Sequence, residues 1–358
     1  MAAKHVFAAM SGGVDSSVTA FLLKEAGYQV TGVFMKNWEE PASAETCPAS
    51  IDMADAQAVC EQLHIEFRAI NFANEYWEHV FTYFLDAYRQ GLTPNPDILC
   101  NKEIKFKAFL DYAKQYQADY MATGHYVRSQ QQDNVWQLLK GLDPNKDQSY
   151  FLYALSQQQL SHSLFPVGHL QKSAVRALAK KLGLKIHAKK DSTGICFIGE
   201  RRFKDFLNEY LPAHPGEIHT PEGELIGKHD GLMFYTIGQR QGLQIGGKKG
   251  KSEAPWYVIG KDIANNILLV AQGEHPALYA SSLLAKDLHW IAGIPPSSQE
   301  IAAKIRYRQT EQACRIQAVN ETCYDVLFTQ PQRAITPGQS IVFYQGDICL
   351  GGGIIDRN

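Results

Sequence analysis

The chain has 358 residues, of which 45% are hydrophobic and 20% are charged, and its formal net charge is −2. The length predicts roughly two or three domains, and the composition is that of a globular protein with hydrophobic cores. No apolar run approaches the ~20 residues that cross a bilayer, and Met1-Ala2-Ala3-Lys4 leads directly into a predicted strand without a signal-peptide pattern. We therefore expect a cytoplasmic protein with no membrane partner. Any nucleic-acid binding must come from local basic patches.

The number and spacing of the cysteines argue against a disulfide-rich protein and against a cysteine-ligated metal site. The chain has seven cysteines, an odd number, and no CxxC pair. Dispersed cysteines of this kind are atypical of a disulfide scaffold and of zinc or iron–sulfur sites. In a reducing compartment, a functional cysteine is expected to act as a reactive thiol. The cysteines are at positions 47, 60, 100, 196, 314, 323 and 349.

The first predicted strand, 4–10, leads into the glycine-rich turn Ser11-Gly12-Gly13-Val14-Asp15-Ser16-Ser17, and a predicted helix follows at 16–26. A strand, a glycine-rich turn and a helix N-terminus together present backbone N–H groups to phosphate. The Gly-Lys-Ser/Thr ending of a Walker A loop is missing. The turn instead resembles the SGGxDS loop of the ATP pyrophosphatases, which split ATP into AMP and pyrophosphate. A purely structural Gly-Gly turn is the alternative.

The first half of the chain alternates predicted strands and helices. The predicted strands are 4–10, 29–35, 66–71 and 119–123, and the predicted helices are 16–26, 53–63, 74–89 and 103–117. Repeated strand–helix units predict a parallel, doubly wound sheet with ligands at the carboxyl ends of its strands. The loops after Met10, Met35 and Thr123 are therefore expected to open onto one crevice that holds phosphate and adenine.

A proline-rich loop introduces the first cysteine of chemical interest, in the segment TPNPDILCNK at 93–102. Two prolines fix the loop backbone. Asp97 and Cys100 then enter a helix three residues apart, so both can face one space. Lys102 and the helix N-terminus would each favour the thiolate of Cys100. A buried structural cysteine beside a capping aspartate is the alternative.

A second cysteine, Cys196, lies in the loop segment DSTGICFIGER at 191–201, just before a helix predicted to start near Arg202. Sequence separation does not establish whether Cys196 and Cys100 are close in the fold. Upstream, residues 172–190 contain seven Lys or Arg and no Asp or Glu. Such a run indicates either a nucleic-acid patch or a solvated helix face.

From about Gly216 the pattern changes to short alternating runs separated by turn signals, which predicts an all-β region. A composition break at 276–282 favours two β domains over one barrel. The predicted strands are 256–260, 267–270, 301–307, 313–319, 323–328 and 340–344.

Nine motifs occur in one order along the chain. They are SGGVDSS at 11–17, GVFMKNW at 32–38, TPNPDILCNKEIKF at 93–106, ATGHY at 122–126, DQSYFL at 147–152, DSTGICFIGER at 191–201, YTIGQRQGL at 235–243, RYRQ at 306–309 and PGQ at 337–339. On these motifs the chain resembles the tRNA-specific 2-thiouridylase family (MnmA or TrmU) over essentially its whole length. The resemblance implies an α/β ATP pyrophosphatase domain of the adenine nucleotide alpha hydrolase type at 1–205. A central β-rich tRNA-binding domain at 206–280 and a C-terminal β-barrel at 281–358 would follow.

The resemblance also assigns site residues. It implies that Cys100 is the nucleophile, that Cys196 carries a persulfide and that Asp97 handles a proton. The implied ATP-binding residues are Ala9, Met10, Ser11, Gly12, Gly13, Val14, Asp15, Ser16, Met35 and Gly124. The implied tRNA-binding residues are Asn95, Pro96, Asp97, His125, Lys146, Asp147, Gln148, Arg306, Tyr307 and Gln339. Mg²⁺ is expected with the ATP phosphates, and its protein ligands stay unassigned beyond a role for Asp15.

The implied reaction is sulfur transfer to the wobble uridine of the tRNA anticodon stem-loop. ATP would adenylate the 2-oxygen of the uridine, the Cys196 persulfide would deliver sulfur, and Cys100 would form a transient disulfide with Cys196 as AMP leaves. A monomer and a persulfide-carrying donor protein are expected. The sequence identifies neither that donor nor the set of tRNAs, and it leaves open whether the attacking species is the persulfide or released hydrosulfide. The alternatives are an amide or guanidine synthase of the ATP pyrophosphatase group, and a nucleotide-sensing RNA-binding protein without chemistry.

Overall fold

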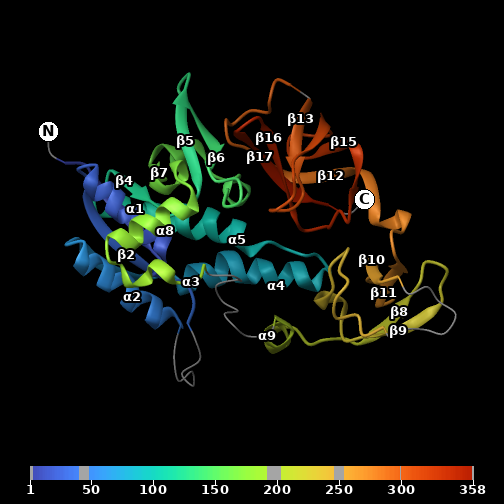
Figure 1. The fold of residues 1–358 in the computed structure, drawn as a ribbon. Coiled ribbons are helices and arrows are strands. Elements are labelled where there is room, and N and C mark those ends of the chain that lie inside the picture. Colours follow the sequence, from blue (N-terminus) through green and yellow to red (C-terminus); the bar gives the residue numbers. More distant parts are fainter. Residues whose placement is uncertain (1–2, 40–47, 192–202, 246–253, 299, 357–358) are drawn as a thin grey trace.

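A parallel β-sheet with the strand order β3-β2-β1-β4-β7 organises the N-terminal part of the chain (Figure 1). The computed structural model describes residues 3–39, 48–191, 203–245, 254–298 and 300–356. Each neighbouring pair of this sheet is parallel, which confirms the predicted fold class. The strands are β1 (His5–Met10), β2 (Gln29–Lys36), β3 (Glu66–Asn71), β4 (Tyr120–Ala122) and β7 (Ser163–Leu164).

Alternate residues of β1 face two separate hydrophobic cores, because successive side chains of a strand point to opposite faces. Val6, Ala8 and Met10 pack in the core that contains α1, α2 and α8, whereas Phe7 and Ala9 pack in the core that contains α3 to α6. Helices therefore cover both faces of the sheet, as a doubly wound fold requires. The helices are α1 (Val14–Glu25), α2 (Pro48–Gln62), α3 (Ala73–Tyr76), α4 (Thr82–Arg89), α5 (Pro96–Leu99), α6 (Phe109–Gln115), α7 (Gln157–Ser161), α8 (Lys172–Lys181) and α9 (Phe203–Tyr210).

Two of the predicted helices contain π-helical segments. The predicted helix 74–89 runs through α3, a π-helical turn at Trp77–Phe81 and α4. The predicted helix 103–117 begins earlier, at Pro96, because the Asn95 side chain accepts a hydrogen bond from the Asp97 N–H at 3.2 Å and caps the helix. It then passes through a π-helical segment at Cys100–Ala108 before α6. Such segments are frequent at functional sites, and Cys100 is the first residue of this one.

A hairpin that the sequence pattern did not predict links the parallel-sheet domain to the C-terminal barrel. It consists of β5 (Val127–Gln132) and β6 (Val135–Lys140), joined by Asp133 and Asn134, which both have positive φ. Strand β6 pairs antiparallel with β17 of the barrel. The outer half of β5 is exposed, so no alternation of apolar residues marked it as a strand.

The rest of the chain forms two separate β domains, as predicted. The central sheet has the order β10-β11-β8-β9, and pairing of β12 with β17 closes the C-terminal strands into a barrel. The central strands are β8 (Gly216–His219), β9 (Leu225–His229), β10 (Trp256–Asp262) and β11 (Ile267–Gln272). The barrel strands are β12 (Tyr279–Trp290), β13 (Glu300–Lys304), β14 (Gln312–Ala318), β15 (Tyr324–Arg333), β16 (Ser340–Gln345) and β17 (Ile348–Ile355).

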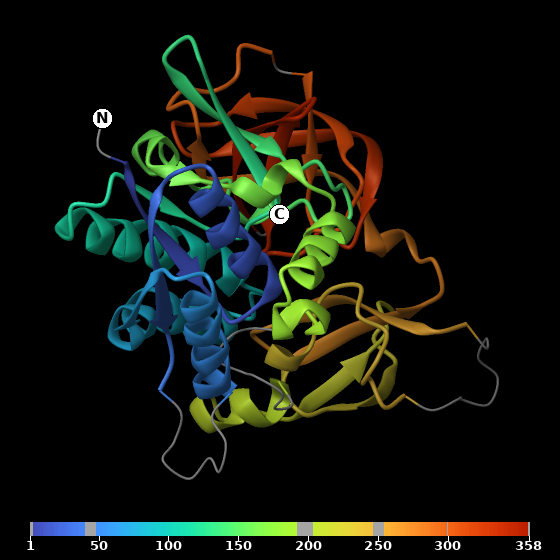
Figure 2. The ribbon, with the colours of Figure 1, turned by 60° about the vertical axis from the view of Figure 1, so that its left-hand side comes forward.

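The three bodies lie against one another, with the barrel and the central domain on one side of the parallel-sheet domain (Figures 1 and 2). One hydrophobic core runs from the parallel-sheet domain into the barrel, since Leu138 of β6 belongs to the same buried cluster as Tyr344 of β16 and Cys349 of β17. The predicted strand 301–307 ends at Lys304, so Arg306 and Tyr307 lie in the turn that follows it. Across the described ranges, no helix combines the length and apolar character needed to span a membrane.

The shared core generates a stability prediction. Leu138 is fully buried, and a Leu138→Ala substitution should lower the free energy of unfolding by about 2–5 kcal/mol. Because Leu138 connects two domains, calorimetry should show the transitions of both the parallel-sheet domain and the barrel moving to lower temperature. The matched control is Leu327→Ala on the outside of the barrel, where the side chain is 56% exposed and the expected change is within about 0.5 kcal/mol. Equal effects of the two substitutions would contradict a shared core.

Candidate functional site

The glycine-rich turn after β1 is held in shape by its own serines. The Ser11 N–H donates to Ser16 Oγ at 3.1 Å, and the hydroxyls of Ser16 and Ser17 donate to the Gly13 carbonyl at 3.1 and 2.8 Å. Gly12 has φ of +70°, and a Cβ there would lie 2.3 Å from the Asp52 carbonyl oxygen. Only glycine fits this position. The 12-residue helix α1 follows, and Gly13 at its N-cap supplies no side-chain cap, which suits a helix N-terminus that receives an anion.

The carboxyl ends of β1, β2 and β4 meet at this turn. In the sheet, Met10 pairs with Phe34 and Ala8 pairs with Ala122. Met35 follows Phe34 near the end of β2, and Gly124 lies two residues beyond the end of β4. A Cβ on Gly124 would lie 2.8 Å from the Ser16 nitrogen. The sequence-predicted ATP-binding residues therefore come together at the sheet edge where the strand order reverses, the usual ligand crevice of such folds.

A buried lysine joins the glycine-rich turn 11–17, called the phosphate loop below, to Asp191, which precedes the segment of the second cysteine. Lys172, at the start of α8, has a side chain that is 10% exposed, and its Nζ lies 2.7 Å from the carboxylate of Asp15 and 2.8 Å from that of Asp191. Asp15 also accepts a hydrogen bond from the Tyr126 hydroxyl at 2.7 Å. A buried charge requires partners of this kind. In the sequence, Lys172 is one of seven basic residues of the run 172–190 and nothing sets it apart from the others.

Asp191 is the acidic centre of this cluster. Besides Lys172 it pairs with Lys146 at 2.6 Å and with Arg176 at 2.9 Å. Burial by itself raises the pKa of this carboxyl, but hydrogen bonds from Lys146 and Lys172 and their positive charges outweigh it and bring the pKa down to about 2. Asp191 is also the last described residue before the segment that carries Cys196. Cys196 itself lies outside the described residues.

The basic run 172–190 divides into two kinds of residue. Lys172, Arg176 and Lys189 are engaged with carboxylates, and the Lys189 ammonium contacts Asp52 at 2.7 Å and Asp55 at 2.5 Å and donates to the Gly12 carbonyl at 3.1 Å. The remaining basic residues of the run are exposed; they are Lys180, Lys181, Lys185 and Lys190. Lys172 and Lys189 therefore support the glycine-rich turn, and the exposed lysines are the residues of this run that offer unpaired positive charge to an external anion.

The first cysteine segment places Asp97, Cys100 and His125 in one region. Cys100 is buried, 2% exposed. Burial raises the pKa of Asp97 against the opposing charge of Lys105, and burial together with the same Lys105 holds the pKa of His125 well below its usual value. Lys105 is therefore the cation that acts electrostatically on both groups.

Lys105 was not singled out in the sequence, where Lys102 was the expected cation beside Cys100. The Lys102 ammonium instead lies 3.4 Å from the Glu103 carboxylate, and its side chain is about half exposed. Lys105 follows Asp97 by eight residues, and the π-helical segment Cys100–Ala108 begins between them. In the sequence, nothing distinguishes Lys105 from the neighbouring Lys102 and Lys107.

The predicted tRNA-binding residues of the barrel contact the parallel-sheet domain or the turn 334–339. The Tyr307 ring packs on Phe151, with centroids 4.4 Å apart. Arg306 donates to the Arg333 and Ala334 carbonyls, and burial lowers its pKa. The Gln339 side chain donates to the Thr93 carbonyl at 2.8 Å.

The side chains of Asp147 and Gln148, which were predicted to bind tRNA, are hydrogen-bonded to the backbone of neighbouring segments. The Asp147 side chain is buried and accepts from the Gly141 N–H at 3.0 Å and from the Ser149 N–H and hydroxyl at 3.1 and 2.9 Å. The Gln148 side chain accepts from the Tyr126 N–H at 2.9 Å. Asp147 therefore shapes the loop that carries Lys146 and Gln148. Among the described residues, no cluster of three or more His, Cys, Asp or Glu could hold a metal ion.

Comparison with known proteins gives matches along nearly the whole chain. Three family models match consecutive segments: a tRNA methyl transferase HUP domain at residues 4–200, a tRNA methyl transferase PRC-barrel domain at 204–272 and an aminomethyltransferase beta-barrel domain at 280–355. A tRNA-specific 2-thiouridylase MnmA from Methylococcus capsulatus is 61% identical over 356 residues, which is 98% of this chain and 96% of that protein. Proteins of the same name from Pasteurella multocida and Proteus mirabilis are 60% and 61% identical, covering 99% of this chain and 93% and 97% of their own lengths.

The tight approach of Gly124 to α1 predicts an effect on nucleotide affinity. In Gly124→Ala, the new Cβ would press on the Ser16 nitrogen at 2.8 Å, and relieving that overlap should cost about 1–3 kcal/mol. Titration calorimetry should then show an ATP Kd raised roughly 5- to 150-fold. Gly227→Ala is the control, since a Cβ there meets only Ile218 at 3.9 Å. An unchanged Kd in Gly124→Ala would contradict ATP binding at this turn.

The depressed pKa of Asp191 predicts a pH-dependent contribution to stability. The folded pKa of about 2 lies below the ordinary value of 3.8, so the contribution is present above pH 4 and is lost as pH falls towards 2. Urea unfolding of wild type and Asp191→Asn should differ most at neutral pH and converge as pH falls through that window. Asp133→Asn, in the exposed turn of the β5–β6 hairpin, controls for loss of a surface carboxylate. A difference that stays constant with pH would contradict the ion cluster.

Proposed function

The chain belongs to the tRNA-specific 2-thiouridylase family, and we propose that it replaces the 2-oxygen of the wobble uridine of tRNA with sulfur in an ATP-dependent reaction. The match to 2-thiouridylases along almost the entire chain carries this proposal. Two features of the site support it: the phosphate loop at the carboxyl edge of the sheet, and the capped segment that leads from Asn95 to Cys100. The alternative of an amide or guanidine synthase is not favoured, because the relatives that match nearly the full length of this chain are named 2-thiouridylases.

ATP is proposed to bind with its phosphates on the turn Ala9–Ser16 and its nucleoside beside Met35 and Gly124. The positive end of α1 and the nearby ammonium of Lys172 would offset the phosphate charge. Mg²⁺ is proposed to arrive on the phosphates, where it would neutralise charge on the departing pyrophosphate. Asp15 is the acidic residue of the turn, and its carboxylate is already bonded to Lys172 and Tyr126, so it could at most share in holding the ion.

The chemistry begins with the 2-oxygen of the uridine attacking the α-phosphorus of ATP, which releases pyrophosphate. Oxide is a poor leaving group from the ring carbon, whereas AMP is a good one. Asn95, Pro96 and Asp97 are proposed to hold the base, which must be extruded from its stack to reach these residues. Burial raises the pKa of Asp97, which makes it a better proton carrier near neutral pH than an exposed aspartate.

Sulfur transfer is proposed to use both cysteines. The terminal sulfur of the Cys196 persulfide attacks the activated ring carbon, and AMP leaves with the original oxygen. The Cys100 thiolate then attacks Sγ of Cys196, so that the sulfur–sulfur bond of the adduct breaks and its electron pair stays on the new 2-thiouridine. The products include a Cys100–Cys196 disulfide, which a cellular thiol must reduce. A persulfide-carrying donor protein then reloads Cys196.

The tRNA is proposed to lie across the parallel-sheet domain and the barrel. His125 and the loop 146–148 would contact it from the first, and Arg306, Tyr307 and Gln339 from the second. We propose that the protein acts as a monomer.

The two-cysteine reaction predicts a specific loss of activity. Cys100→Ser and Cys196→Ser should each abolish 2-thiouridine formation and leave ATP binding intact, because both remove a sulfur that the reaction needs and neither lies in the phosphate loop. The assay incubates the protein with ATP, a sulfur donor and unmodified tRNA, and then measures nucleosides by mass spectrometry. Cys323→Ser is the control, since Cys323 lies in the barrel and is partly exposed. Wild-type levels of thiolated tRNA from either catalytic variant would refute the proposal.

A further inference from the structure

The two β domains bind the backbone of the loop that precedes the nucleophile. Lys261 of the central domain donates to the Gly91 carbonyl at 3.1 Å. On the barrel side, the Pro337 carbonyl accepts from the Thr93 N–H at 3.0 Å, and Gln339 donates to the Thr93 carbonyl at 2.8 Å. Three polar groups of residues 91–93 are thus bonded to other domains, immediately before Asn95 and Cys100.

The close approach of the barrel to this loop depends on one glycine. Gly338 has φ of +90°, and a Cβ there would lie 2.8 Å from the Thr93 nitrogen and 2.9 Å from the Leu92 Cβ. The Gly338 N–H donates to the carbonyl of Ile355, and the Ile355 N–H donates to that of Gln339, at 2.9 and 2.8 Å. The end of β17 therefore holds the turn 334–339 rigidly against Thr93.

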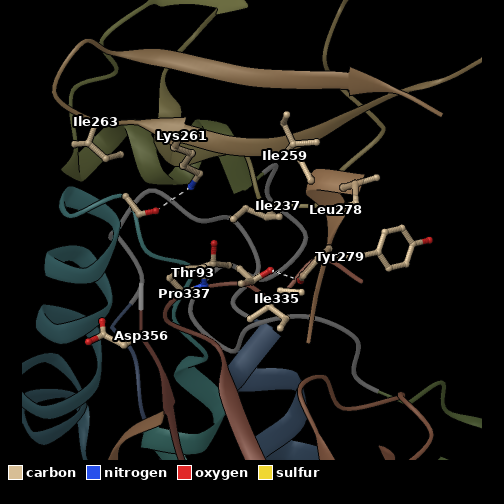
Figure 3. A pocket seen from close by; sticks show the side chains of 15 residues that line it. Thr93, Ile237, Ile259, Lys261, Ile263, Leu278, Tyr279, Ile335, Pro337 and Asp356 are labelled. Atoms are coloured by element: carbon tan, nitrogen blue, oxygen red, sulfur yellow. Dashed lines mark hydrogen bonds between the residues drawn. The ribbon is translucent and has the colours of Figure 1, made fainter. Parts of the chain in front are cut away.

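Packing around the loop is incomplete on one side of this junction. A cavity of about 310 Å³ lies beside it, between the three domains, and is lined mainly by apolar side chains such as Ile237, Ile259 and Ile335. Figure 3 shows Lys261 reaching from the central domain towards the loop across this cavity, with Thr93 and Pro337 on the opposite side. Close packing normally fixes the position of a segment in a protein interior. Beside this cavity, the hydrogen bonds to Gly91 and Thr93 contribute more to the position of the loop.

The same turn is bonded to a predicted tRNA-binding residue. The Arg306 guanidinium donates to the Ala334 carbonyl, and the Thr336 hydroxyl donates to the same carbonyl at 2.9 Å. A short bonded path therefore runs from Arg306 through the turn 334–339 to Thr93. The RNA-binding side of the barrel and the nucleophile segment are its two ends.

We propose that Gly338 and Lys261 are positioning residues for sulfur transfer: they clamp the loop 91–96 from the two β domains and so fix Asn95, Asp97 and Cys100 relative to the target base. The inference rests on the proposed function. A displaced loop would still allow ATP and tRNA to bind, but Cys100 and the base would be misaligned. Misplacement by about 1 Å can lower a rate by roughly 100-fold.

The test compares Gly338→Ala with Gly293→Ala, a barrel glycine with φ of +79° and nothing within 4 Å of an added Cβ. Both substitutions impose backbone strain, but only the first presses on Thr93. Thiolation by Gly338→Ala should show kcat lowered by about 10- to 100-fold with unchanged ATP Kd. Gly293→Ala should keep wild-type kcat. A second pair, Lys261→Met and Lys261→Arg, removes and retains a donor to Gly91 from the other domain, so the first should lower kcat and the second should restore it.

Hydrogen exchange supplies a readout that does not depend on activity. The Thr93 amide, bonded to Pro337, should exchange slowly in wild type and in Gly293→Ala and rapidly in Gly338→Ala. Wild-type kcat in Gly338→Ala, a change confined to KM, or equal exchange in the two glycine variants would each overturn the clamp. If wild type itself produces no 2-thiouridine, the proposed function fails, and the exchange comparison still decides whether the barrel holds the loop.

Discussion

The ion pairs of Lys172 with Asp15 and Asp191 connect the parts of the site that the sequence keeps far apart. Lys172 is buried, and an unpaired ammonium in that place would be strongly destabilising. Its two partners are therefore held close to it: Asp15 in the first turn of α1 and Asp191 at the start of the segment with the second cysteine. The glycine-rich turn and Asp191, which precedes the segment of the second cysteine, thus share one buried charge. An anion bound at α1 would act on the same charges that anchor the second cysteine segment.

The second constraint is the attachment of the barrel. Strand β6 leaves the parallel-sheet domain and pairs with β17, and Leu138 joins one core to the other. This rigid connection sets the turn 334–339 against Thr93, where no ordinary loop-to-loop contact would suffice to fix a catalytic segment. Under the proposed clamp, the three-domain arrangement also determines where Asn95, Asp97 and Cys100 lie.

Much of this architecture was predictable, because its signals are local. Four of the five strands of the parallel sheet and the turn at Ser11–Ser17 followed from apolar runs and glycine placement, and the family resemblance followed from ordered motifs. The hairpin β5–β6 was missed because the outer part of β5 is polar on both sides. Its only local mark is the Asp133–Asn134 turn. Lys102 was singled out, and Lys105 was not, because Lys102 lies only two residues from Cys100 in the sequence. Asp147 was predicted to contact RNA. Its carboxylate accepts hydrogen bonds from Gly141 and Ser149 and lies near Lys304 of the barrel, and contacts between residues so far apart in the chain are not visible in the sequence. The burial of Lys172 was equally hidden, since paired and solvated lysines have the same sequence signature.

The central claim is that AMP is transferred to the oxygen that sulfur later replaces. The most direct measurement uses tRNA with ¹⁸O at position 2 of the wobble uridine, incubated with ATP, the sulfur donor and wild-type protein, followed by mass analysis of the released AMP. The account predicts one ¹⁸O atom in AMP for each 2-thiouridine formed, because the ring carbon–oxygen bond breaks with the oxygen on phosphorus. AMP without the label, formed in step with 2-thiouridine, would contradict it.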